Sequence, residues 1–125
     1  MAAGEQVLVV EDNEKSMKLF RDVLQATGYR TLEATTGEHA VELAAAHVPA
    51  LVLMDVQLPG IDGVETLALL RHDARTAAIP VLALTAQAMH GDRARLLDAG
   101  FDGYLAKPVD IVELLRVVEQ QCGRA

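Results

Sequence analysis

The stretch Ala50–Gly63, which reads ALVLMDVQLPGIDG, decides the fold of this chain. It begins with the apolar run 50–54, which is short enough to be one β-strand buried on both faces. The run ends at Asp55, and Pro59 and Gly60 then indicate a turn before the next helix. A carboxylate at the end of a buried strand costs free energy unless other groups compensate its charge. Because ligands of parallel sheets bind at the carboxyl ends of the strands, Asp55 is the first candidate site residue.

Short apolar runs alternate with amphipathic stretches along the rest of the chain. This alternation predicts a parallel sheet with helices on both faces, because each crossover is right-handed. We expect one α/β domain over residues 1–125, with the flavodoxin-like, doubly wound strand order 2-1-3-4-5 and five helices. The expected strands are about 7–10, 29–34, 50–54, 81–84 and 103–106, and the second is half polar, as is typical of an edge. The expected helices are about 13–27, 36–46 (or from 35), 64–72, 89–99 and 110–121. Asp110, with Glu113 three residues later, predicts a capping box at the start of the last helix.

The composition is that of an ordinary globular domain, with 51% apolar and 23% charged residues. The net charge of −7 argues against electrostatic binding to DNA, RNA or anionic membranes. No apolar run approaches the ~20 residues of a membrane span, and the N-terminus does not resemble a signal peptide. We therefore expect a cytoplasmic protein with no nucleic-acid partner and no membrane insertion. Cys122 is the single cysteine, which excludes an internal disulfide, and the four histidines lack metal-ligand spacing.

Polar side chains follow four of the expected strands. Glu11 and Asp12 follow the first strand, Asp55 ends the third, Thr85 the fourth and Lys107 the fifth. In the order 2-1-3-4-5 these strand ends share one edge of the sheet. Three neighbouring carboxylates repel one another unless a cation intervenes, and oxygen ligands of this kind suit Mg²⁺. Together with a hydroxyl and an ammonium group, they predict a phosphoryl-transfer site with Asp55 as the nucleophile.

Four motifs in this order resemble the signature of the receiver domains of two-component response regulators. They are Val9–Asn13, Met54–Gly60, Thr85-Ala86 and Tyr104–Pro108. Within that family the chain is similar to single-domain cell-division regulators of the DivK type. The stretches that carry this finer likeness are Glu11–Glu14, Met17–Phe20, Thr27–Tyr29 and Ala86–Met89, with Gly91-Asp92.

The resemblance implies a phosphoacceptor and its metal ligands. Asp55 would take a phosphoryl group from a sensor histidine kinase or a histidine phosphotransfer protein. Mg²⁺ would be held by Asp12, by Asp55 and by the backbone carbonyl of Gln57, with Glu11 acting largely through water. Glu11-Asp12 stands where many relatives have two aspartates. Glutamate makes one side chain longer but keeps its negative charge.

The resemblance also implies a switch and an output surface. Thr85 and Lys107 would contact the phosphoryl oxygens, and a cis peptide bond before Pro108 would turn the lysine into the site. Tyr104 would be the switch aromatic that responds to Thr85. The fourth helix, fifth strand and fifth helix would then contact a downstream protein effector, as a monomer or as a weak phosphorylation-dependent dimer.

The implied function is a stand-alone signalling switch and not a metabolic enzyme, with only self-phosphorylation and autodephosphorylation chemistry. The Met1 start and the short tail favour a complete chain. The alternatives are a receiver excised from a larger hybrid kinase or regulator, or an intermediate in a phosphate relay. A phosphatase of the haloacid-dehalogenase type would want a second Asp where Gln57 stands, and a flavin carrier would want a phosphate-binding loop where 11–14 is acidic. The full set of acidic, threonine and lysine residues argues against a pseudo-receiver.

The residues alone leave three points open: Tyr104, the last helix and two glutamines. Taken alone, Tyr104 is better explained as a half-buried edge aromatic, and only the family pattern favours a switch. The last helix has more apolar residues than one core face needs, so Val112 or Val117 is expected to face outward as a partner contact. Gln57 and Gln87 would flank the phosphoryl group, which leaves the lifetime of the phosphorylated form open.

Overall fold

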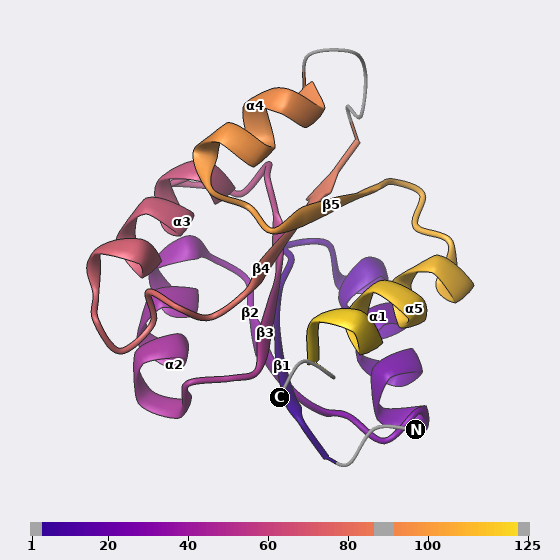
Figure 1. Ribbon diagram of the computed structural model, residues 1–125. Helices are drawn as coiled ribbons and strands as arrows, with labels where there is room; N and C mark the ends of the chain where they lie inside the picture. Colours follow the sequence, from indigo (N-terminus) through magenta and orange to yellow (C-terminus); the bar gives the residue numbers. More distant parts are fainter. Residues whose placement is uncertain (1–3, 87–91, 123–125) are drawn as a thin grey trace.

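The computed structural model describes residues 4–86 and 92–122 of the chain, and Figure 1 shows its ribbon. Strands and helices alternate throughout these residues. The strands are β1 (Gln6–Val10), β2 (Arg30–Ala34), β3 (Leu51–Asp55), β4 (Val81–Thr85) and β5 (Gly103–Ala106). The helices are α1 (Glu14–Ala26), α2 (Gly37–His47), α3 (Gly63–His72), α4 (Asp92–Ala99) and α5 (Ile111–Cys122). None of these helices has the length and apolar character needed to cross a bilayer.

The strands form one parallel sheet in the order β2-β1-β3-β4-β5, which confirms the expected doubly wound topology. Val10 of β1 lies opposite Ala34 of β2 on one side and opposite Met54 of β3 on the other. On the next strand pair, Asp55 lies opposite Leu84 of β4. The carboxyl ends of these strands therefore meet at one edge of the sheet, where the polar residues that follow them are neighbours.

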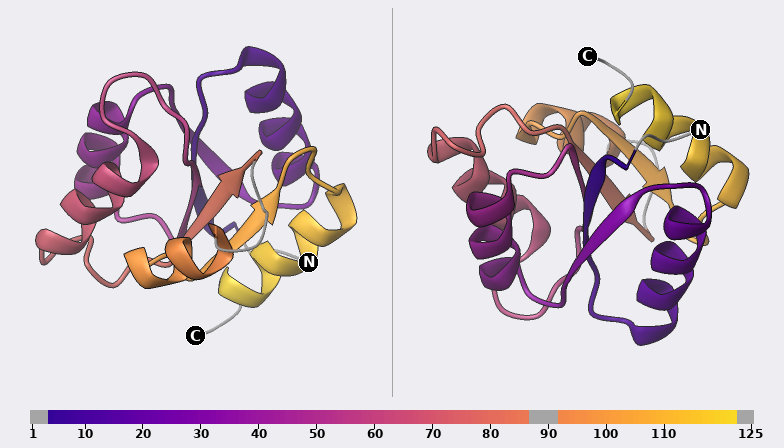
Figure 2. Two further views of the ribbon diagram at one scale, coloured as in Figure 1. Left: turned by 90° about the horizontal axis from the view of Figure 1, so that it is seen from above. Right: turned by 90° about the horizontal axis from the view of Figure 1, so that it is seen from below.

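Helices cover both faces of the sheet, as the two further views in Figure 2 also show. Helices α1 and α5 pack on one face, and α2, α3 and α4 on the other. Along β1 the side chains alternate, so that Val7 and Val9 contact the α1/α5 layer while Leu8 and Val10 contact the opposite layer. Strands β3 and β4 are buried at every residue, which explains their continuous apolar sequence.

Three helices begin at a residue whose side chain caps the first turn. Asn13 accepts a hydrogen bond from the N–H three residues later at 3.0 Å, and Thr36 does so at 3.1 Å. At α3 the Asp62 carboxylate accepts from the N–H of Glu65 at 2.8 Å, while the Glu65 carboxylate accepts from the N–H of Asp62 at 3.3 Å. This reciprocal capping box was not predicted from the sequence.

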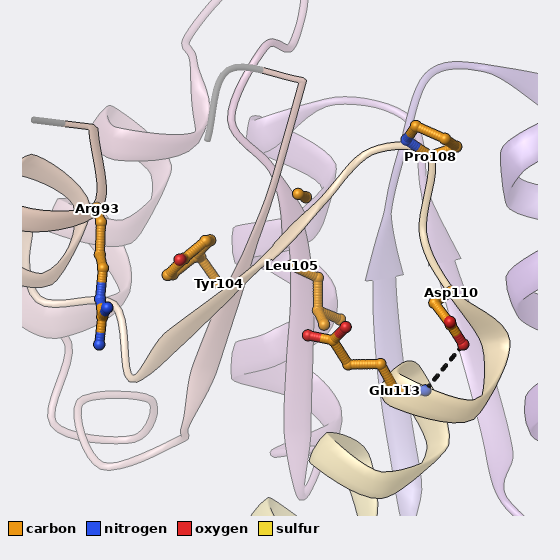
Figure 3. Close-up of a pocket in the computed structure, with 7 residues that line it drawn as sticks. Arg93, Tyr104, Leu105, Pro108, Asp110 and Glu113 are labelled. Carbon is orange, nitrogen blue, oxygen red and sulfur yellow. Dashed lines mark hydrogen bonds between the residues drawn. The ribbon is translucent and has the colours of Figure 1, made fainter. Parts of the chain in front are cut away.

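Of the capping box that was expected at α5, the structure shows the half in which the Asp110 side chain accepts from backbone N–H groups. One carboxylate oxygen of Asp110 accepts from the N–H of Val112 at 2.8 Å and from the N–H of Glu113 at 3.2 Å. The Glu113 side chain instead reaches toward β5, as Figure 3 shows.

Element boundaries differ from the expected ones by a residue or two. Helix α3 begins one residue early, at Gly63, because Asp62 caps it. Helix α2 continues to His47, and the expected beginning of the fourth helix near Met89 lies outside the described residues. Gly28 follows α1 in the left-handed conformation, with φ of 98°, as expected for the residue after a helix end.

At the amino ends of β4 and β5, a hydrogen-bond network forms around Arg71. Its guanidinium donates to two carbonyl oxygens of the α3–β4 connection, at 3.0 and 2.6 Å. It also donates to the Gly100 carbonyl at 3.1 Å and to the Asp102 carboxylate at 3.0 Å. The same Asp102 oxygen accepts from the N–H of Val81 at 2.7 Å. We call this the amino-edge network; it joins α3, the start of β4 and the approach to β5.

Candidate functional site

The opposite edge of the sheet brings together side chains from three strand ends. Glu11 and Asp12 follow β1, Asp55 is the last residue of β3, and Lys107 directly follows β5. Because β4 separates β3 from β5, the lysine side chain must reach past the end of β4 to meet the carboxylates. The structure therefore places all four side chains where the sequence pattern expected them.

Lys107 bridges two carboxylates that come from different strands. Its Nζ atom lies 2.8 Å from Glu11 Oε1 and 3.0 Å from Asp55 Oδ2. Burial lowers the pKa of Lys107, but the hydrogen bonds and charges of Glu11 and Asp55 outweigh burial and raise the pKa above its usual value. The lysine therefore holds a fixed positive charge beside Asp55.

Glu11 lies in an environment that disfavours its charged form. Its side chain is fully buried. Burial raises the pKa of Glu11 to about 7, the nearby Asp55 acts in the same direction, and Lys107 opposes both. Within the described part of the chain, Glu11 Oε2 is buried without a hydrogen-bond partner. A buried acceptor oxygen of this kind is stabilised by a cation placed next to it.

The three carboxylates have the spacing of a cation site. One ligand oxygen from each of Glu11, Asp12 and Asp55 lies within 4.8 Å of the others. Asp12 is exposed, so the cluster is open to solvent on that side. Three carboxylates face one ammonium group, which leaves excess negative charge, and a set of oxygen ligands matches the chemistry of Mg²⁺. The unpartnered Glu11 oxygen and this donor set therefore fit a magnesium ion.

Local backbone contacts fix Asp55 in place. Its Oδ1 atom accepts a hydrogen bond from the N–H of Gln57 at 3.0 Å. The N–H of Gly63 donates to the carbonyl of Val56 at 2.9 Å, which brings the start of α3 against the end of β3. A Cβ atom at position 63 would lie 2.7 Å from the Asp55 carbonyl oxygen, so a side chain there would collide with the strand. The metal-ligand role of the Gln57 carbonyl stays a prediction.

Thr85 and Lys107 are connected through the backbone of β4 and β5. The N–H of Lys107 donates to the Thr85 carbonyl at 2.8 Å, and Thr85 is buried. The peptide bond between Lys107 and Pro108 is cis, as the family resemblance implies. These contacts place Thr85 and Lys107 at adjacent strand ends, and the Lys107 side chain reaches Asp55.

Tyr104 is the second residue of β5 and lies opposite Ala83 of β4. It is partly buried and packs against the core layer formed with α2, α3 and α4. Figure 3 shows its ring on the side of β5 that faces α4, near Arg93. Its function as a switch stays a prediction. Of the two candidates for an outward apolar residue, Val112 is 77% exposed whereas Val117 packs against the core.

The remaining candidate groups are exposed, lie near the C-terminus or fall outside the described residues. His39, His47 and His72 are exposed, and His90 lies outside the described residues, as does Gln87. Burial raises the pKa of Cys122 to about 11, which favours the protonated thiol over the nucleophilic thiolate at neutral pH.

The sequence interpretation missed one feature, a groove on the α4/α5 side of β5. Asp110 and Glu113 were interpreted only as helix-capping residues, although their spacing also places them on one side of the helix. Arg93 of α4 was not singled out.

Comparisons with known proteins agree with this geometry. Residues 7–119 match the family described as "Response regulator receiver domain". The polar-differentiation response regulator DivK of Brucella ovis is 42% identical over 119 residues, which cover 95% of this chain and 97% of DivK. DivK of Brucella anthropi is similar to the same extent.

Solved structures of receiver domains have the same fold as this chain. The receiver domain of a sensor histidine kinase from Pseudomonas aeruginosa PAO1 has a TM-score of 0.89 and 36% identity, over 97% of this chain and 99% of the other. That structure holds a magnesium ion in its active-site cleft. The receiver domain of a Francisella response regulator has a TM-score of 0.90 and 28% identity, over 97% of this chain and 98% of the other.

The flavodoxin-like sheet, the acidic cluster and the lysine are thus found together with a family match over nearly the whole chain. This chain belongs to the family of response regulator receiver domains.

Proposed function

We propose that this chain is a phosphate-accepting signalling switch in which Asp55 takes a phosphoryl group from a phosphohistidine. The donor would be a sensor histidine kinase or a histidine phosphotransfer protein. One observation carries the proposal: Asp55 lies 3.0 Å from the Lys107 ammonium in a cluster that also contains a buried, unpartnered oxygen of Glu11.

In the transfer, an oxygen of the Asp55 carboxylate would attack phosphorus while the bond from phosphorus to the donor imidazole nitrogen breaks. The electron pair of that bond would stay on the imidazole. Lys107 would pair with the developing negative charge on the phosphoryl oxygens, and the buried Thr85 hydroxyl would donate a hydrogen bond to one of them. Because both groups are held by the strands, little reorganisation is needed during the reaction.

Glu11, Asp12 and Asp55 would hold Mg²⁺, together with the Gln57 carbonyl. When bound, the ion supplies positive charge that offsets repulsion between the carboxylates and the incoming phosphoryl group. The chain's own contribution is the fixed position of these oxygens. Glu11 is locked by complete burial and by its ion pair with Lys107, and Asp55 by the N–H of Gln57.

The product would act through contacts with another protein and not through turnover of a metabolite. Phosphorylation replaces one carboxylate charge with about −1.5 to −2 charges, which pull on Thr85 and Lys107 at the ends of β4 and β5. These strands lead into α4 and α5, so we assign the output surface to α4, β5 and α5. The likeness to DivK supports a cytoplasmic signalling role in cell division or polar differentiation. A phosphate-relay intermediate, or a receiver within a hybrid kinase, would use the same Asp55 chemistry.

Intact-mass spectrometry after incubation with acetyl phosphate and Mg²⁺ tests the proposal. We expect the wild type to gain one phosphoryl group when Mg²⁺ is present and not after chelation. Asp55→Asn should gain none. Asp98→Asn, which alters an exposed carboxylate of α4, serves as a matched control and should behave as the wild type does.

Addition to Asp55→Asn would assign the phosphate to a different residue. If the wild type gains no mass, beryllofluoride would be added and the tyrosine fluorescence, which comes from Tyr29 and Tyr104, would be followed. A response that depends on Mg²⁺ and Asp55 indicates a phosphorylated form too short-lived to isolate, whereas no response contradicts the proposal.

A further inference from the structure

The loop between β3 and α3, residues 56–62, holds two backbone groups of the phosphorylation site. We call it the acceptor loop. The N–H of Gln57 donates to Asp55 Oδ1 at 3.0 Å, and the carbonyl of Gln57 is the ligand that we propose for Mg²⁺. Because both groups belong to the main chain, any contact that fixes the course of the acceptor loop also fixes their positions.

The far end of the acceptor loop contacts the start of α2. Helices α2 and α3 lie side by side on the same face of the sheet (Figure 1 and Figure 2). A Cβ atom added at Gly37, the first residue of α2, would lie 2.7 Å from Cγ1 of Ile61, and the Thr66 hydroxyl would lie closer still. At the next residue, the Glu38 carboxylate lies over Gly60, where an added Cβ would be 3.4 Å from Oε2. The start of α2 is therefore in contact with the loop and with the first turn of α3.

Space, and not backbone conformation, requires glycine at position 37. The φ angle of Gly37 lies outside the left-handed region, so alanine could adopt the same backbone and would ordinarily be the better helix former. An alanine fits only if its neighbours withdraw. Thr66 cannot simply turn away, because its fully buried hydroxyl donates to the Asp62 carbonyl at 2.7 Å.

A displaced Thr66 would move the acceptor loop with it. The N–H of Thr66 also donates to the Asp62 carbonyl, at 2.9 Å, so two hydrogen bonds join the first turn of α3 to the last residue of the loop. The N–H of Gly63 then donates to the carbonyl of Val56 at 2.9 Å, which ties the end of the loop back to its beginning. Val56 directly precedes Gln57, so packed neighbours transmit a shift of α3 to the Gln57 peptide.

We propose that Gly37 is a positioning residue of the phosphorylation site. The absence of a side chain there lets Ile61 and Thr66 approach α2, and this approach sets where the N–H and carbonyl of Gln57 lie. The effect on Mg²⁺ rests on the proposed function, since the Gln57 carbonyl is a metal ligand only in that proposal. The effect on the Gln57 hydrogen bond to Asp55 does not depend on it.

Hydrogen exchange and calorimetry of Gly37→Ala test this inference. Exchange of the Gln57 amide in metal-free protein, followed by nuclear magnetic resonance, reports its bond to Asp55. The Val81 amide, which donates to Asp102 at 2.7 Å at the amino edge, is the internal reference for general loosening. We expect the Gln57 amide to exchange faster relative to that of Val81. Titration calorimetry should show Mg²⁺ binding about tenfold more weakly, as is typical when a group that orients a metal ligand is changed.

Gly103→Ala is the matched control, because it crowds a glycine at the opposite edge of the sheet. Its added Cβ would lie 3.0 Å from the Leu82 side chain. This variant should leave the relative exchange of the Gln57 amide and the Mg²⁺ affinity as they are in the wild type.

A mutant cycle isolates the contact itself. In the background Ile61→Ala with Thr66→Ala, the three atoms nearest to an added Cβ are absent, so Gly37→Ala should have no further effect on either measurement. If Gly37→Ala does not fold, Thr66→Ser and Thr66→Val act on the same contact. Serine keeps the hydroxyl and should behave as the wild type does, whereas valine loses the bond to Asp62 and should weaken Mg²⁺ binding.

Unchanged relative exchange of the Gln57 amide in Gly37→Ala would overturn the inference, because α2 would then have yielded in place of the acceptor loop. Unchanged Mg²⁺ affinity, an equal change in Gly103→Ala, or an effect that persists in the double-alanine background would overturn it as well. If the wild type binds no Mg²⁺, the proposed function is contradicted, while the Gln57 amide of the metal-free protein still decides the inference.

Discussion

The two edges of the sheet each hold a cluster of charged side chains, and the clusters differ in how completely they are satisfied. At the amino edge, Arg71 donates four hydrogen bonds and Asp102 accepts from both the arginine and a backbone N–H. At the carboxyl edge, Lys107 contacts two of three clustered carboxylates, and among the described residues one buried oxygen of Glu11 has no partner. Charge balance, and not the mere presence of charge, therefore separates a structural cluster from a reactive one.

The difference follows from what each cluster must do. A satisfied network lowers the free energy of the folded chain and gains nothing from a ligand. An unbalanced cluster raises that free energy, and the binding of a cation or a change in protonation can recover the difference. Variants and conditions that act on one edge and not on the other test this comparison.

Removal of the Arg71 guanidinium should have the largest effect. Arg71→Ala leaves two carbonyls of the α3–β4 connection, the Gly100 carbonyl and Asp102 without their donor. We expect the free energy of unfolding to fall by about 2–3 kcal/mol, measured by urea denaturation. The free energy of unfolding of Arg71→Lys should lie between those of the wild type and Arg71→Ala. Lysine keeps the positive charge but lacks the planar guanidinium that donates several hydrogen bonds at once.

Arg75→Ala is the control for that experiment. Arg75 forms its ion pair with Asp73 in solvent, so its removal should leave the unfolding midpoint unchanged. An equal loss for both variants would show that the amino-edge network has no special role in stability.

Mg²⁺ should act at the carboxyl edge with the next largest effect. At tenfold its dissociation constant, a ligand that binds only the folded state stabilises it by ~1.4 kcal/mol. The wild type and Arg71→Lys should both gain this amount, while Asp12→Ala should not. Thermal unfolding with and without Mg²⁺ measures the gain, and a response in Asp12→Ala would place the ion elsewhere.

Neutralising Asp55 should change stability less. In chelator, Asp55→Asn removes one of three crowded carboxylates but also one partner of Lys107. We expect the free energy of unfolding to stay the same or to rise by ~1 kcal/mol at most. A clear fall in the free energy of unfolding, measured by urea denaturation, would mean that the Lys107 contact stabilises more than the carboxylate repulsion destabilises. The charges at the carboxyl edge would then be closer to balance than the distances suggest.

The pH dependence should give the smallest but most specific signal. The pKa of Glu11 is raised to about 7 by burial and by Asp55, against the opposing effect of Lys107, whereas an unfolded glutamate titrates near its usual 4.5. Between these values the folded chain binds a proton that the unfolded chain has lost. The stability from Glu11 is thus complete below the unfolded pKa and is lost as the pH rises through about 7.

Urea denaturation in chelator across this pH window checks the sign. As the pH rises toward about 7, the free energy of unfolding of the wild type should fall relative to that of Glu11→Gln, whose amide at position 11 cannot titrate. Mg²⁺ should reduce the difference, because bound cation favours the ionised glutamate. A wild type that gains stability relative to Glu11→Gln as the pH rises would contradict the burial argument.

The sequence was sufficient to predict whatever depends on strand order. Continuous apolar runs identified β3 and β4, and parallel order then placed Asp55 and Lys107 at a common edge. Features that depend on the exact rotation of helices could not be predicted, such as whether Val112 or Val117 faces outward. Pairing between Arg71 and Asp102 was also invisible, because nothing in the sequence links positions so far apart. The unpartnered oxygen of Glu11 depends on which oxygen Lys107 contacts, and only coordinates reveal it.

The close approach at Gly63 has a consequence for genetics. A side chain at this position would press on the backbone of Asp55 itself, although residue 63 carries no functional group. A screen for variants that cannot accept phosphate should therefore return substitutions of Gly63 in which every acidic residue and Lys107 are intact. Such variants would have the phenotype of a lost catalytic group. The actual cause would be that the start of α3 displaces the acceptor Asp55.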